Sequence, residues 1–502
     1  MSVDCPAVRV RIAPSPTGYM HVGTARTALF NWLFARHTGG TFVLRVEDTD
    51  RGRYVPDALE DLYAGLRWLG LEPDEGPERG GPHAPYLQSQ RRALYDAAAQ
   101  TLLEAGHAYR CFCSAERLAR VRERSQVAGG KVGYDRRCRD LPGPEAAARA
   151  ARGERHVVRL AMPLAGTLTL RDRVRGAIVF DAGELEDVVL IKGDGFPTYH
   201  LAVVVDDHAM GITHVLRADE WIPSAPVQVR LYEAFGWPEP EWAHLPLVLD
   251  PSGKGKLSKR KTAAPGTPGS DLLTQVREYR AAGFLPEAML NFLALQGWAW
   301  SGEDEIADRA TLVERFDLAD VRPAPSAWDM AKLRWMNGVY IRALPPDELA
   351  ERMLPFLRRA GLPAEPDQVR RMAPLVQERL ETLEDGARWL GFFWADSVAP
   401  HPGELVAKKL DAPTAARVLG ASRARLAQAG PWEARDIETA LRAVAAELGL
   451  GAGPTFHPVR VAVTGQSVSP PLFETLAIVG REQTLTRLDR ARALLEPDGG
   501  DR

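Results

Sequence analysis

Hydrophobic and polar residues alternate near the start of the chain and then change period. Residues 8–12, VRVRI, carry apolar side chains at every second position, which predicts a β-strand. From about 23 to 36 apolar residues recur at helical spacing, and the glycines within 38–40 end that helix. Residues 41–48 predict a second strand. A strand, a helix and a strand in this order form a βαβ unit, so we expect a parallel sheet at the beginning of an α/β domain.

The later pattern predicts a change of fold class. Residues 187–208 contain an apolar run that predicts buried strands returning to the sheet, and 213–221 predict another strand. Gly, Pro and Lys dominate residues 250–269, as is typical of a mobile loop. Beyond about residue 270 apolar residues recur at helical spacing. We therefore predict an N-terminal α/β domain with an insertion, followed by an all-α C-terminal half.

The composition is that of an ordinary globular protein. The chain has 502 residues, 45% hydrophobic and 26% charged, which is enough for about three to five domains. No apolar run approaches the ~18–20 residues of a membrane helix, and the first residues lead directly into a strand, so we expect neither a membrane segment nor a secretory signal. Four cysteines do not form a disulfide framework, which favours a reducing, cytoplasmic location.

Positive charge is concentrated in one segment. The net charge of the whole chain is only −3, so a nucleic-acid partner would have to bind a local patch. Residues 110–159 contain 13 Lys and Arg against 6 Asp and Glu, a balance of +7. This excess favours contact with a polyanion, and the alternative is a solvated arginine-rich helical surface.

A loop rich in proline and glycine precedes the first predicted helix. In residues 14–23, PSPTGYMHVG, the prolines stiffen the loop, and His21 and Gly23 stand at the start of the helix. The unpaired N–H groups and positive dipole end of a helix N-terminus suit a phosphate, and glycine lets the phosphate approach the backbone. His21 can donate a hydrogen bond to a phosphoryl oxygen. Taken alone, the same histidine is equally compatible with a helix cap or a surface residue.

A second basic loop lies far along the chain. The pentapeptide KLSKR, residues 256–260, belongs to the glycine-rich and proline-rich loop described above. Lysines on a flexible loop can close over a triphosphate and neutralise charge that grows in the transition state. A solvated basic loop is the alternative. The presence of both loops around a predicted βαβ sheet favours a nucleotide site at the carboxyl ends of the strands.

The two loops together carry a family resemblance. HVGT at 21–24 followed by KLSKR at 256–260 resembles the paired nucleotide-binding signatures of class I aminoacyl-tRNA synthetases. More narrowly, four segments resemble bacterial glutamyl-tRNA synthetase: 13–51, 199–221, 256–262 and 332–341. Residues 461–480 resemble the anticodon-binding half of the same family. The resemblance therefore runs nearly from end to end.

The resemblance implies an ATP-dependent glutamate–tRNA ligase. In such enzymes the carboxylate of L-glutamate attacks the α-phosphorus of ATP, pyrophosphate leaves, and the acyl group moves to the 3′-terminal adenosine of tRNA(Glu). Mg²⁺ accompanies the ATP and shields the departing pyrophosphate. The family also leads us to expect a monomer without a membrane partner.

The resemblance assigns residues to this chemistry. His21 and Lys259 would be the catalytic residues, which stabilise the reacting phosphates. The expected ATP-binding residues are Pro14, Ser15, Pro16, Thr17, Gly18, His21, Gly23, Thr24, Glu220, Lys256, Leu257, Ser258, Lys259 and Arg260. The expected glutamate-binding residues are Arg11, Ala13, Ser15, Glu47, Tyr199, Arg217 and Trp221.

The residue types suit a glutamate site, which must neutralise two carboxylates and one ammonium. Arg11 and Arg217 suit the carboxylates because a guanidinium can form two parallel hydrogen bonds, and Glu47 suits the ammonium. The hydroxyls of Ser15 and Tyr199 can add hydrogen bonds. Outside the family context, the arginines could be surface residues on strands, Tyr199 a core aromatic, and Glu47 part of an N-cap cluster or a metal site.

Three of the four cysteines cluster within the basic segment. Cys111, Cys113 and Cys138, with Asp140 close behind, resemble a zinc-binding segment found in some members of the family, which have a histidine at the position of Asp140. A carboxylate can ligate zinc, and Tyr134 is another candidate for the fourth ligand. Reduced structural cysteines are the alternative to a Zn²⁺ site.

The resemblance also implies a domain plan. We expect an α/β fold with a Rossmann-like parallel-sheet catalytic domain, an inserted α/β domain and an all-α C-terminal half. The expected domains are the first catalytic half (1–95), an inserted acceptor-stem-binding domain (96–196), the second catalytic half (197–252), a stem-contact region with the lysine loop (253–338) and two helical anticodon-binding domains (339–395 and 396–502).

Other proteins share parts of this pattern. Glutaminyl-tRNA synthetase would end in β-barrels, and the truncated enzyme that glutamylates a modified tRNA base would lack the C-terminal half. A tRNA-independent nucleotidyltransferase would be shorter, and a non-catalytic RNA-binding paralogue would lack the catalytic residues. The helical C-terminal pattern, together with His21 and Lys259, favours the glutamate-specific ligase.

Overall fold

The chain folds into two compact units. A computed structural model describes residues 7–127, 133–257, 273–408 and 410–495. The first unit comprises Met1–Tyr279 and Met289–Met330, and the second comprises Arg280–Ala288 and Ala331–Arg502. Among the described residues, none of the helices has both the length and the apolar character that crossing a membrane requires.

Parallel strands form the centre of the first unit. β1 (Arg9–Ile12) pairs in parallel with β2 (Thr41–Leu44), and β8 (His214–Ala218) pairs in parallel with β9 (Glu241–Leu245). The N–H of Thr213, just before β8, donates to the carbonyl oxygen of Arg9 at 2.9 Å. β1 therefore lies beside β8 as well as β2. The predicted parallel sheet is confirmed.

The first helix completes the predicted βαβ unit. α1 (Val22–His37) joins β1 to β2 and ends at Thr38, whose N–H bonds to the carbonyls of Phe34 and Arg36. Most of its residues are buried, because the helix contacts β1, β2, β8 and α10 (Arg309–Arg315). Its N-terminus is thereby fixed at the carboxyl end of β1.

Residues 187–208 differ from the strands predicted for them. Only β7 (Val189–Ile191) is a strand, and α6 (Tyr199–Ala209) is a helix. Residues 201–207 of α6 are all buried, so the helix has no polar face there to reveal its period, and its valines favour a strand by propensity alone. Packing in the interior therefore outweighs the local preference of the sequence.

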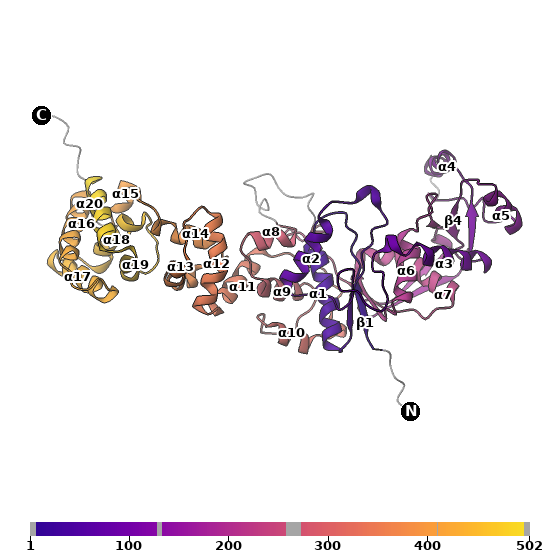
Figure 1. Cartoon of the computed structure of the whole chain (residues 1–502), viewed down its shortest axis with the longest axis horizontal. Helices are drawn as coiled ribbons and strands as arrows, with labels where there is room; N and C mark the ends of the chain where they lie inside the picture. The colour runs from indigo at the N-terminus through magenta and orange to yellow at the C-terminus, as the bar shows by residue number, and fades with distance from the viewer. Residues whose placement is uncertain (1–6, 128–132, 258–272, 409, 496–502) are drawn as a thin grey trace, which may run out of the picture. The chain divides into compact units, whose positions relative to one another are not determined.

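An antiparallel sheet forms the inserted part of the first unit. β4 (Val157–Leu160) pairs with β3 (Ala108–Cys111) on one side and with β7 on the other. α4 (Ala115–Val127) and α5 (Gly143–Ala151) come between β3 and β4 in the chain (Figure 1). This part has the mixed helix and strand content that the sequence predicts for the insertion.

A β-hairpin connects the inserted part to the parallel strands. β5 (Thr167–Asp172) pairs along its whole length with β6 (Gly176–Asp181). Asp172, the last residue of β5, also pairs in parallel with Trp242 of β9, which gives a sheet of strand order β6-β5-β9-β8. The carboxyl end of β5 is therefore held beside β9.

Further helices and two short strands belong to the first unit. They are α2 (Ala58–Leu69), α3 (Arg92–Glu104), α7 (Ala225–Phe235), α8 (Val276–Ala281), α9 (Pro286–Ala294), β10 (Val248–Leu249) and β11 (Ser326–Ala327). Two of these helices, α8 and α9, extend into the segment 280–288 of the second unit. One apolar cluster joins α3, β4, β5, α6, α7 and β8 through residues such as Tyr95, Leu160 and Val215. The inserted part and the parallel strands thus share one core.

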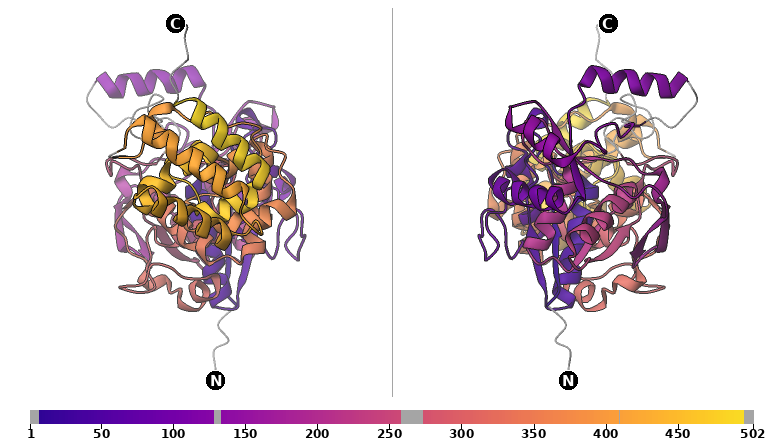
Figure 2. Two further views of the ribbon diagram at one scale, coloured as in Figure 1. Left: turned by 90° about the vertical axis from the view of Figure 1, so that its left-hand side faces the viewer. Right: turned by 90° about the vertical axis from the view of Figure 1, so that its right-hand side faces the viewer.

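Helices supply the regular structure of the second unit, and no strand occurs among its described residues. They are α11 (Met330–Ala343), α12 (Pro346–Arg359), α13 (Pro366–Met372), α14 (Asp385–Leu390), α15 (Pro402–Leu405), α16 (Ala412–Ala427), α17 (Ala434–Glu447), α18 (Ala452–Thr464), α19 (Leu472–Val479) and α20 (Arg481–Ala493). α12 to α14 contribute to one apolar cluster and α16 to α20 to another. Figure 2 (left) shows the helices of the C-terminal part in orange and yellow. The predicted all-α C-terminal half is confirmed.

Candidate active site

A cavity of about 1030 Å³ lies at the carboxyl ends of the parallel strands. Residues that follow β1, β2 and β8 line it, together with Leu247 and Val248 beyond β9. Ligands of parallel sheets bind at this edge, because the ends of adjacent strands and the loops after them meet there. The sequence places the nucleotide site at the same edge.

Most of the residues expected to bind substrates line this one cavity. The expected glutamate-binding residues all do so: Arg11, Ala13, Ser15, Glu47, Tyr199, Arg217 and Trp221. The expected ATP-binding residues that line it are Pro14, Ser15, Thr17, His21, Gly23, Thr24, Glu220, Lys256 and Leu257. Segments far apart in the chain are therefore brought together.

Five of the expected ATP-binding residues are not among those that line the cavity. Pro16 and Gly18 instead line a neighbouring cavity of about 170 Å³, on the other side of the same loop. Ser258, Lys259 and Arg260 lie outside the described residues. The role expected for Lys259 therefore stays a prediction.

His21 is both a helix cap and a residue of the cavity. Its Nδ1 accepts a hydrogen bond from the N–H of Gly23 at 3.0 Å, so the side chain satisfies one of the backbone donors at the start of α1. Because Nδ1 accepts, a neutral imidazole carries its proton on Nε2. A Cβ atom on Gly23 would lie 3.2 Å from Nδ1. The absence of a side chain at Gly23 leaves room for this arrangement.

The same local cap also occurs in the second unit. His401 precedes α15, and its Nδ1 accepts from the N–H of Gly403 at 3.2 Å. A Cβ atom on Gly403 would also lie 3.2 Å from Nδ1 of its histidine. A histidine two residues before a glycine at a helix start is therefore a local device, and its place beside the cavity is what distinguishes His21.

Two of the expected ATP-binding residues contact each other. The ammonium of Lys256 forms an ion pair with the carboxylate of Glu220. Both side chains are roughly half exposed, and both line the cavity. An exposed ion pair of this kind is weak, so a charged ligand can compete for either partner.

Arg217 is buried within the cavity wall, and its guanidinium has two partners. Nε donates to Nε2 of His244 at 2.9 Å, and Nη1 donates to the hydroxyl of Tyr199 at 3.1 Å. Nη2 is buried and has no hydrogen-bond partner among the described residues. Burial lowers the pKa of Arg217. A buried donor without a partner is costly, so this nitrogen suits a ligand carboxylate.

Arg11 is also buried, but its contacts differ from those expected. Its Nε and Nη2 donate to the two carboxylate oxygens of Asp207, at 3.0 and 3.1 Å. Two of its three guanidinium nitrogens therefore bind the protein itself. Arg11 reaches the cavity wall, and its Nε and Nη2 also hold Asp207 in place. The alternative that Arg11 and Arg217 are surface residues is wrong, because they are only 4% and 5% exposed.

Glu47 lies at the edge of a buried charge network. Arg45 is fully buried and contacts Asp206, Asp207 and Glu47, at 3.6, 2.6 and 3.5 Å. Burial raises the pKa of Glu47 to about 7, although Arg45 and Arg11 oppose the shift. A carboxyl group with this pKa gains or loses its charge near neutral pH.

Aromatic rings form another part of the cavity wall. The rings of Tyr199 and Trp221 lie 4.6 Å apart at an angle of 32°. Burial raises the pKa of the Tyr199 hydroxyl, so it stays protonated and can donate or accept a hydrogen bond. Trp221 is 38% exposed, as expected for a ring at the rim of a ligand site.

Several residues behind the cavity wall are absent from the set that the sequence predicts. Arg45, Asp172, Asp207 and His244 position the predicted residues and are all buried. The sequence carries a signal for part of this set. Two adjacent acidic residues, Asp206 and Asp207, interrupt an apolar run, and buried carboxylates require cations as partners. Asp172 and His244 lie 72 positions apart, and no spacing in the sequence relates them.

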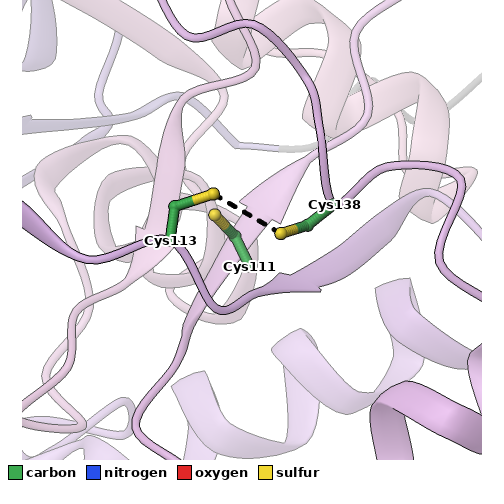
Figure 3. A group of neighbouring side chains, drawn as sticks. All are labelled: Cys111, Cys113 and Cys138. Atoms are coloured by element: carbon green, nitrogen blue, oxygen red, sulfur yellow. Dashed lines mark hydrogen bonds between the residues drawn. The ribbon is translucent and has the colours of Figure 1, made fainter. Parts of the chain in front are cut away.

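The three clustered cysteines come together in the inserted part. Their Sγ atoms all lie within 4.8 Å of one another, and those of Cys113 and Cys138 are 3.5 Å apart (Figure 3). The hydroxyl of Tyr134 lies 3.2 Å from Sγ of Cys111 and 3.8 Å from that of Cys113. Asp140 is exposed and is not part of this group. The structure therefore offers Tyr134 as the fourth ligand atom, and the preference for Asp140 is not supported.

Cations surround the cysteine cluster. Arg117 donates to Sγ of Cys113 at 3.3 Å, and the guanidinium of Arg159 lies 4.0 Å from the centre of the Tyr134 ring. Burial raises the pKa of Cys111, but hydrogen bonds from Tyr134 and Arg159 outweigh it and leave the pKa below its usual range. Burial raises the pKa of Cys113 to about 11. Three thiols and a phenol of this geometry suit a tetrahedral metal ion.

The basic segment is only partly an exposed positive surface. Arg136 and Arg139 donate to the carboxylate of Asp187, which is fully buried. Arg117 pairs with Asp135, and Arg149 pairs with Glu154. The exposed arginines of α4 are Arg120, Arg122 and Arg124. Much of the excess charge therefore serves the fold, and α4 presents the remainder to solvent.

Comparison with known proteins assigns a class to this fold and cavity. Residues 7–335 match the family described as tRNA synthetases class I (E and Q), catalytic domain, and residues 348–492 match an anticodon binding domain. The parallel strands, the cavity at their ends and the helical second unit thus belong to a class I aminoacyl-tRNA synthetase.

Relatives along the whole chain narrow the class to one family. A glutamate–tRNA ligase from Roseiflexus castenholzii is 49% identical over 499 residues, and one from Chloroflexus aurantiacus is 48% identical over 509 residues. The alignments cover 97% and 99% of this chain and 96% and 99% of the relatives. The chain belongs to the glutamate–tRNA ligase family.

A solved structure agrees with this assignment. The crystal structure of a glutamate tRNA ligase from Elizabethkingia meningosepticum, in complex with its amino acid, superposes on this chain with a TM-score of 0.88 at 35% identity. The superposition covers 97% of this chain and all of the other. Both units therefore follow the fold of that enzyme.

Proposed function

We propose that this protein joins L-glutamate to tRNA(Glu) at the expense of ATP. The carboxylate of glutamate attacks the α-phosphorus, pyrophosphate leaves, and the acyl group then passes from the adenylate to the 3′-terminal adenosine of the tRNA. The observation that carries the proposal is the shared cavity, where a helix N-terminus capped by His21 meets a buried arginine–glutamate–tyrosine wall. Phosphates and an amino acid can thus lie side by side.

The phosphate side of the cavity stabilises charge without forming a covalent intermediate. Nε2–H of His21 provides a donor for a phosphoryl oxygen, and the positive end of the α1 dipole adds a favourable potential. Lys256, and the predicted catalytic Lys259, supply positive charge from the neighbouring loop. Mg²⁺, when bound with the ATP, would supply positive charge for the pyrophosphate. Positioning of the two substrates and neutralisation of charge then account for the rate.

The amino-acid side of the cavity recognises glutamate by charge. Nη2 of Arg217 and the hydroxyl of Tyr199 bind one carboxylate, and ionised Glu47 binds the ammonium. Arg11 adds positive potential but keeps its main contacts to Asp207. Glutamine would leave the guanidinium opposite a neutral amide, which makes a weaker hydrogen bond.

The tRNA contacts several parts of the chain. The exposed arginines of α4 suit the phosphates of the acceptor stem within the inserted domain, 96–196, and the region 253–338 continues along the stem. The two helical domains, 339–395 and 396–502, bind the anticodon. We propose that the chain acts as a monomer in the cytoplasm.

We also propose that the cysteine cluster binds one Zn²⁺ ion. Cys111, Cys113 and Cys138 would provide three thiolates and Tyr134 the fourth ligand atom. Zinc in a closed tetrahedral site is structural, and here it would tie α4 and the segment before α5 to β3. It takes no part in the reaction.

Charging assays with pure tRNA transcripts test the function. With tRNA(Glu), ATP and glutamate we expect formation of glutamyl-tRNA and AMP, and ATP–pyrophosphate exchange that depends on glutamate. Exchange supported by glutamine alone would favour a glutaminyl-tRNA synthetase. Exchange without any charging of tRNA would favour a tRNA-independent nucleotidyltransferase, and either outcome would overturn the proposal.

A further inference from the structure

A buried chain of hydrogen bonds leads from the hairpin of the inserted part to the cavity. Oδ2 of Asp172 accepts from Nδ1 of His244 at 2.6 Å and from the N–H of the same residue at 3.0 Å. Nε2 of His244 then faces Nε of Arg217 at 2.9 Å. The side chains of Asp172 and His244 are both fully buried.

The ends of this chain are also fixed. Oδ1 of Asp172 accepts from the N–H groups of Val174 and Arg175, each at 2.9 Å, so rotation of the carboxylate would break hydrogen bonds on both of its oxygens. Beyond His244, the guanidinium of Arg217 lies 5.1 Å from the centre of the Trp242 ring. Arg217 is therefore held by a ring on one side and an imidazole along its edge.

The direction of the hydrogen bonds determines the tautomer of His244. The carboxylate of Asp172 can only accept, so Nδ1 carries the proton, and Nε2 offers a lone pair to the N–H of Arg217. The burial of the imidazole and the nearby Arg217 and Arg175 lower the pKa of His244, while Asp172 opposes the shift. The neutral ring is thus an acceptor for Arg217 rather than a second cation beside it.

We propose that His244 is a positioning residue for substrate recognition, held by Asp172 in the tautomer that accepts from Nε of Arg217. With Nε bound to His244 and Nη1 bound to Tyr199, the guanidinium is kept in one orientation, and Nη2 is left to bind the glutamate carboxylate. His244 does not touch the substrate. This inference rests on the proposed role of Arg217 in binding glutamate.

Two substitutions separate positioning from packing. In H244N the short amide can still donate from the position of Nδ1 to Asp172, but it offers Arg217 no acceptor. In H244Q the amide oxygen can occupy the position of Nε2 and accept from Arg217, while the bond to Asp172 is lost. Both variants remove the ring, so a role in packing alone would affect them alike.

We expect the glutamate KM to distinguish these variants. H244N should raise the glutamate KM about tenfold or more, which corresponds to the removal of one charge-assisted hydrogen bond. H244Q should stay within about threefold of wild type. The ATP KM, and kcat at saturating glutamate, should change little in either variant, because the arginine positions only the amino acid. Equal glutamate KM values for the two variants, or a wild-type value for H244N, would overturn the inference.

A third variant, D172N, keeps the imidazole ring and tests the role of Asp172. In D172N the amide oxygen would accept from the N–H groups of Val174 and Arg175, and its NH₂ group would face Nδ1 of His244 and lose the hydrogen bond from the backbone N–H of His244. This arrangement forces the proton to Nε2, which then opposes the N–H of Arg217. We expect D172N to raise the glutamate KM about tenfold, as in H244N. A wild-type value in a folded D172N protein would contradict the inference.

The Arg217→Ala variant separates this inference from the proposed function. If Arg217→Ala leaves the glutamate KM unchanged, the proposed role of Arg217 fails. If Arg217→Ala raises the glutamate KM but H244N does not, only the positioning role of His244 fails. Thermal unfolding of every variant verifies that a changed KM belongs to a folded protein.

Discussion

At the scale of residues, burial shifts the pKa values of two side chains in the cavity, and each shift favours the uncharged form. Burial lowers the pKa of Arg217 and raises the pKa of Glu47 to about 7. Each group is costly to bury as an ion without a partner. Glutamate has carboxylates that can pair with Arg217 and an ammonium that can pair with Glu47. We therefore expect bound glutamate to stabilise these two charges better than water in the cavity does.

Arg217 is expected to carry a large part of glutamate recognition. Arg217→Ala should raise the glutamate KM about 10- to 150-fold, because a hydrogen bond to a charged group contributes about 1.5–3 kcal/mol. The ATP KM should stay within about threefold. Steady-state charging with varied glutamate measures the effect. Arg173→Ala is the control, because Arg173 lies at the surface in an ion pair with Glu241. Equal effects of the two variants would contradict the assignment.

Glu47 is expected to make glutamate binding depend on pH. Only the ionised carboxylate pairs with the ammonium, so the glutamate KM of the wild type should fall about tenfold between about pH 6 and pH 8. Glu47→Gln should have a high KM without this dependence. Glu72→Gln, at an exposed ion pair with Arg79, should behave as the wild type. A parallel pH dependence in Glu47→Gln would show that another group titrates.

The same pKa shift predicts an effect on the stability of the unliganded protein. The folded state holds the Glu47 proton more tightly than an unfolded glutamate with a pKa of about 4.3. Stability is therefore present at low pH and is lost as the pH rises through about 7. Thermal unfolding between about pH 6 and pH 8 should show a smaller loss of stability in Glu47→Gln than in the wild type.

At the scale of elements, we expect the N-terminus of α1 to lie against the phosphates of ATP. Gly23→Ala places a methyl group 3.2 Å from Nδ1 of His21, so the ring must shift. We expect activity to fall about tenfold, or about 1.4 kcal/mol of transition-state stabilisation. Stability should change by less than about 1 kcal/mol, because alanine favours a helix more than glycine does.

The chain provides a matched control for Gly23→Ala. Gly403→Ala creates the same 3.2 Å approach to a capping histidine, His401, at the start of α15. Charging activity of Gly403→Ala should equal that of the wild type. If both variants lose activity alike, the effect of Gly23→Ala would come from destabilised caps and not from the phosphate site.

The elements that the sequence predicts correctly carry a local signal, although they are largely buried. Arginines alternate with apolar residues in β1, and glycines follow the end of α1. The pattern predicts a strand at α6, which is wrong because the centre of this helix is buried on all sides and its valines favour a strand. A fully buried run of apolar residues does not reveal by its pattern whether it is a strand or a helix.

The candidate site can be predicted only as far as local motifs and the family resemblance reach. His21, Glu47, Tyr199 and Arg217 stand in contiguous motifs, which is why the sequence identifies them. Asp172 and His244 depend on the pairing of β5 with β9, which no local pattern encodes. The hydroxyl of Tyr134 lies 3.2 Å from Sγ of Cys111, a contact between positions 23 residues apart that no local pattern encodes.

The cysteine cluster makes a separate prediction for the inserted element. Purified protein should contain about one zinc per chain, and Tyr134→Phe should weaken zinc binding about tenfold or more, since it removes one of four ligands. Asp140→Ala should leave zinc binding unchanged. Metal analysis and competition with a chromogenic chelator measure both. Zinc-free wild-type protein, or weaker binding in Asp140→Ala alone, would contradict this ligand set.

At the scale of the whole molecule, we expect the binding of tRNA to combine weak interactions over several parts of the chain. The net charge of −3 gives no general attraction to RNA, so local arginines must provide it. The replacement of Arg120, Arg122 and Arg124 by alanine should raise the tRNA KM and leave the glutamate KM unchanged. The slope of log Kd against log salt should become shallower by about 0.7–0.9 for each phosphate that the variant no longer neutralises.

A charge-preserving variant controls for the shape of α4. Replacement of the same three arginines by lysine should keep the salt slope near that of the wild type. Filter binding or fluorescence titration at several salt concentrations measures the slope. A salt slope unchanged by the triple alanine variant would place the tRNA interface elsewhere.

The hairpin β5–β6 has a consequence for protein engineering. By sequence the hairpin belongs to the inserted part. However, Asp172, the last residue of β5, pairs with β9 and accepts a hydrogen bond from His244. A chimaera that exchanges the insertion as a cassette between relatives would also exchange this carboxylate. Crossover points that leave residues 167–181 with the recipient would preserve the amino-acid pocket, whereas a cut at the apparent end of the insertion would not.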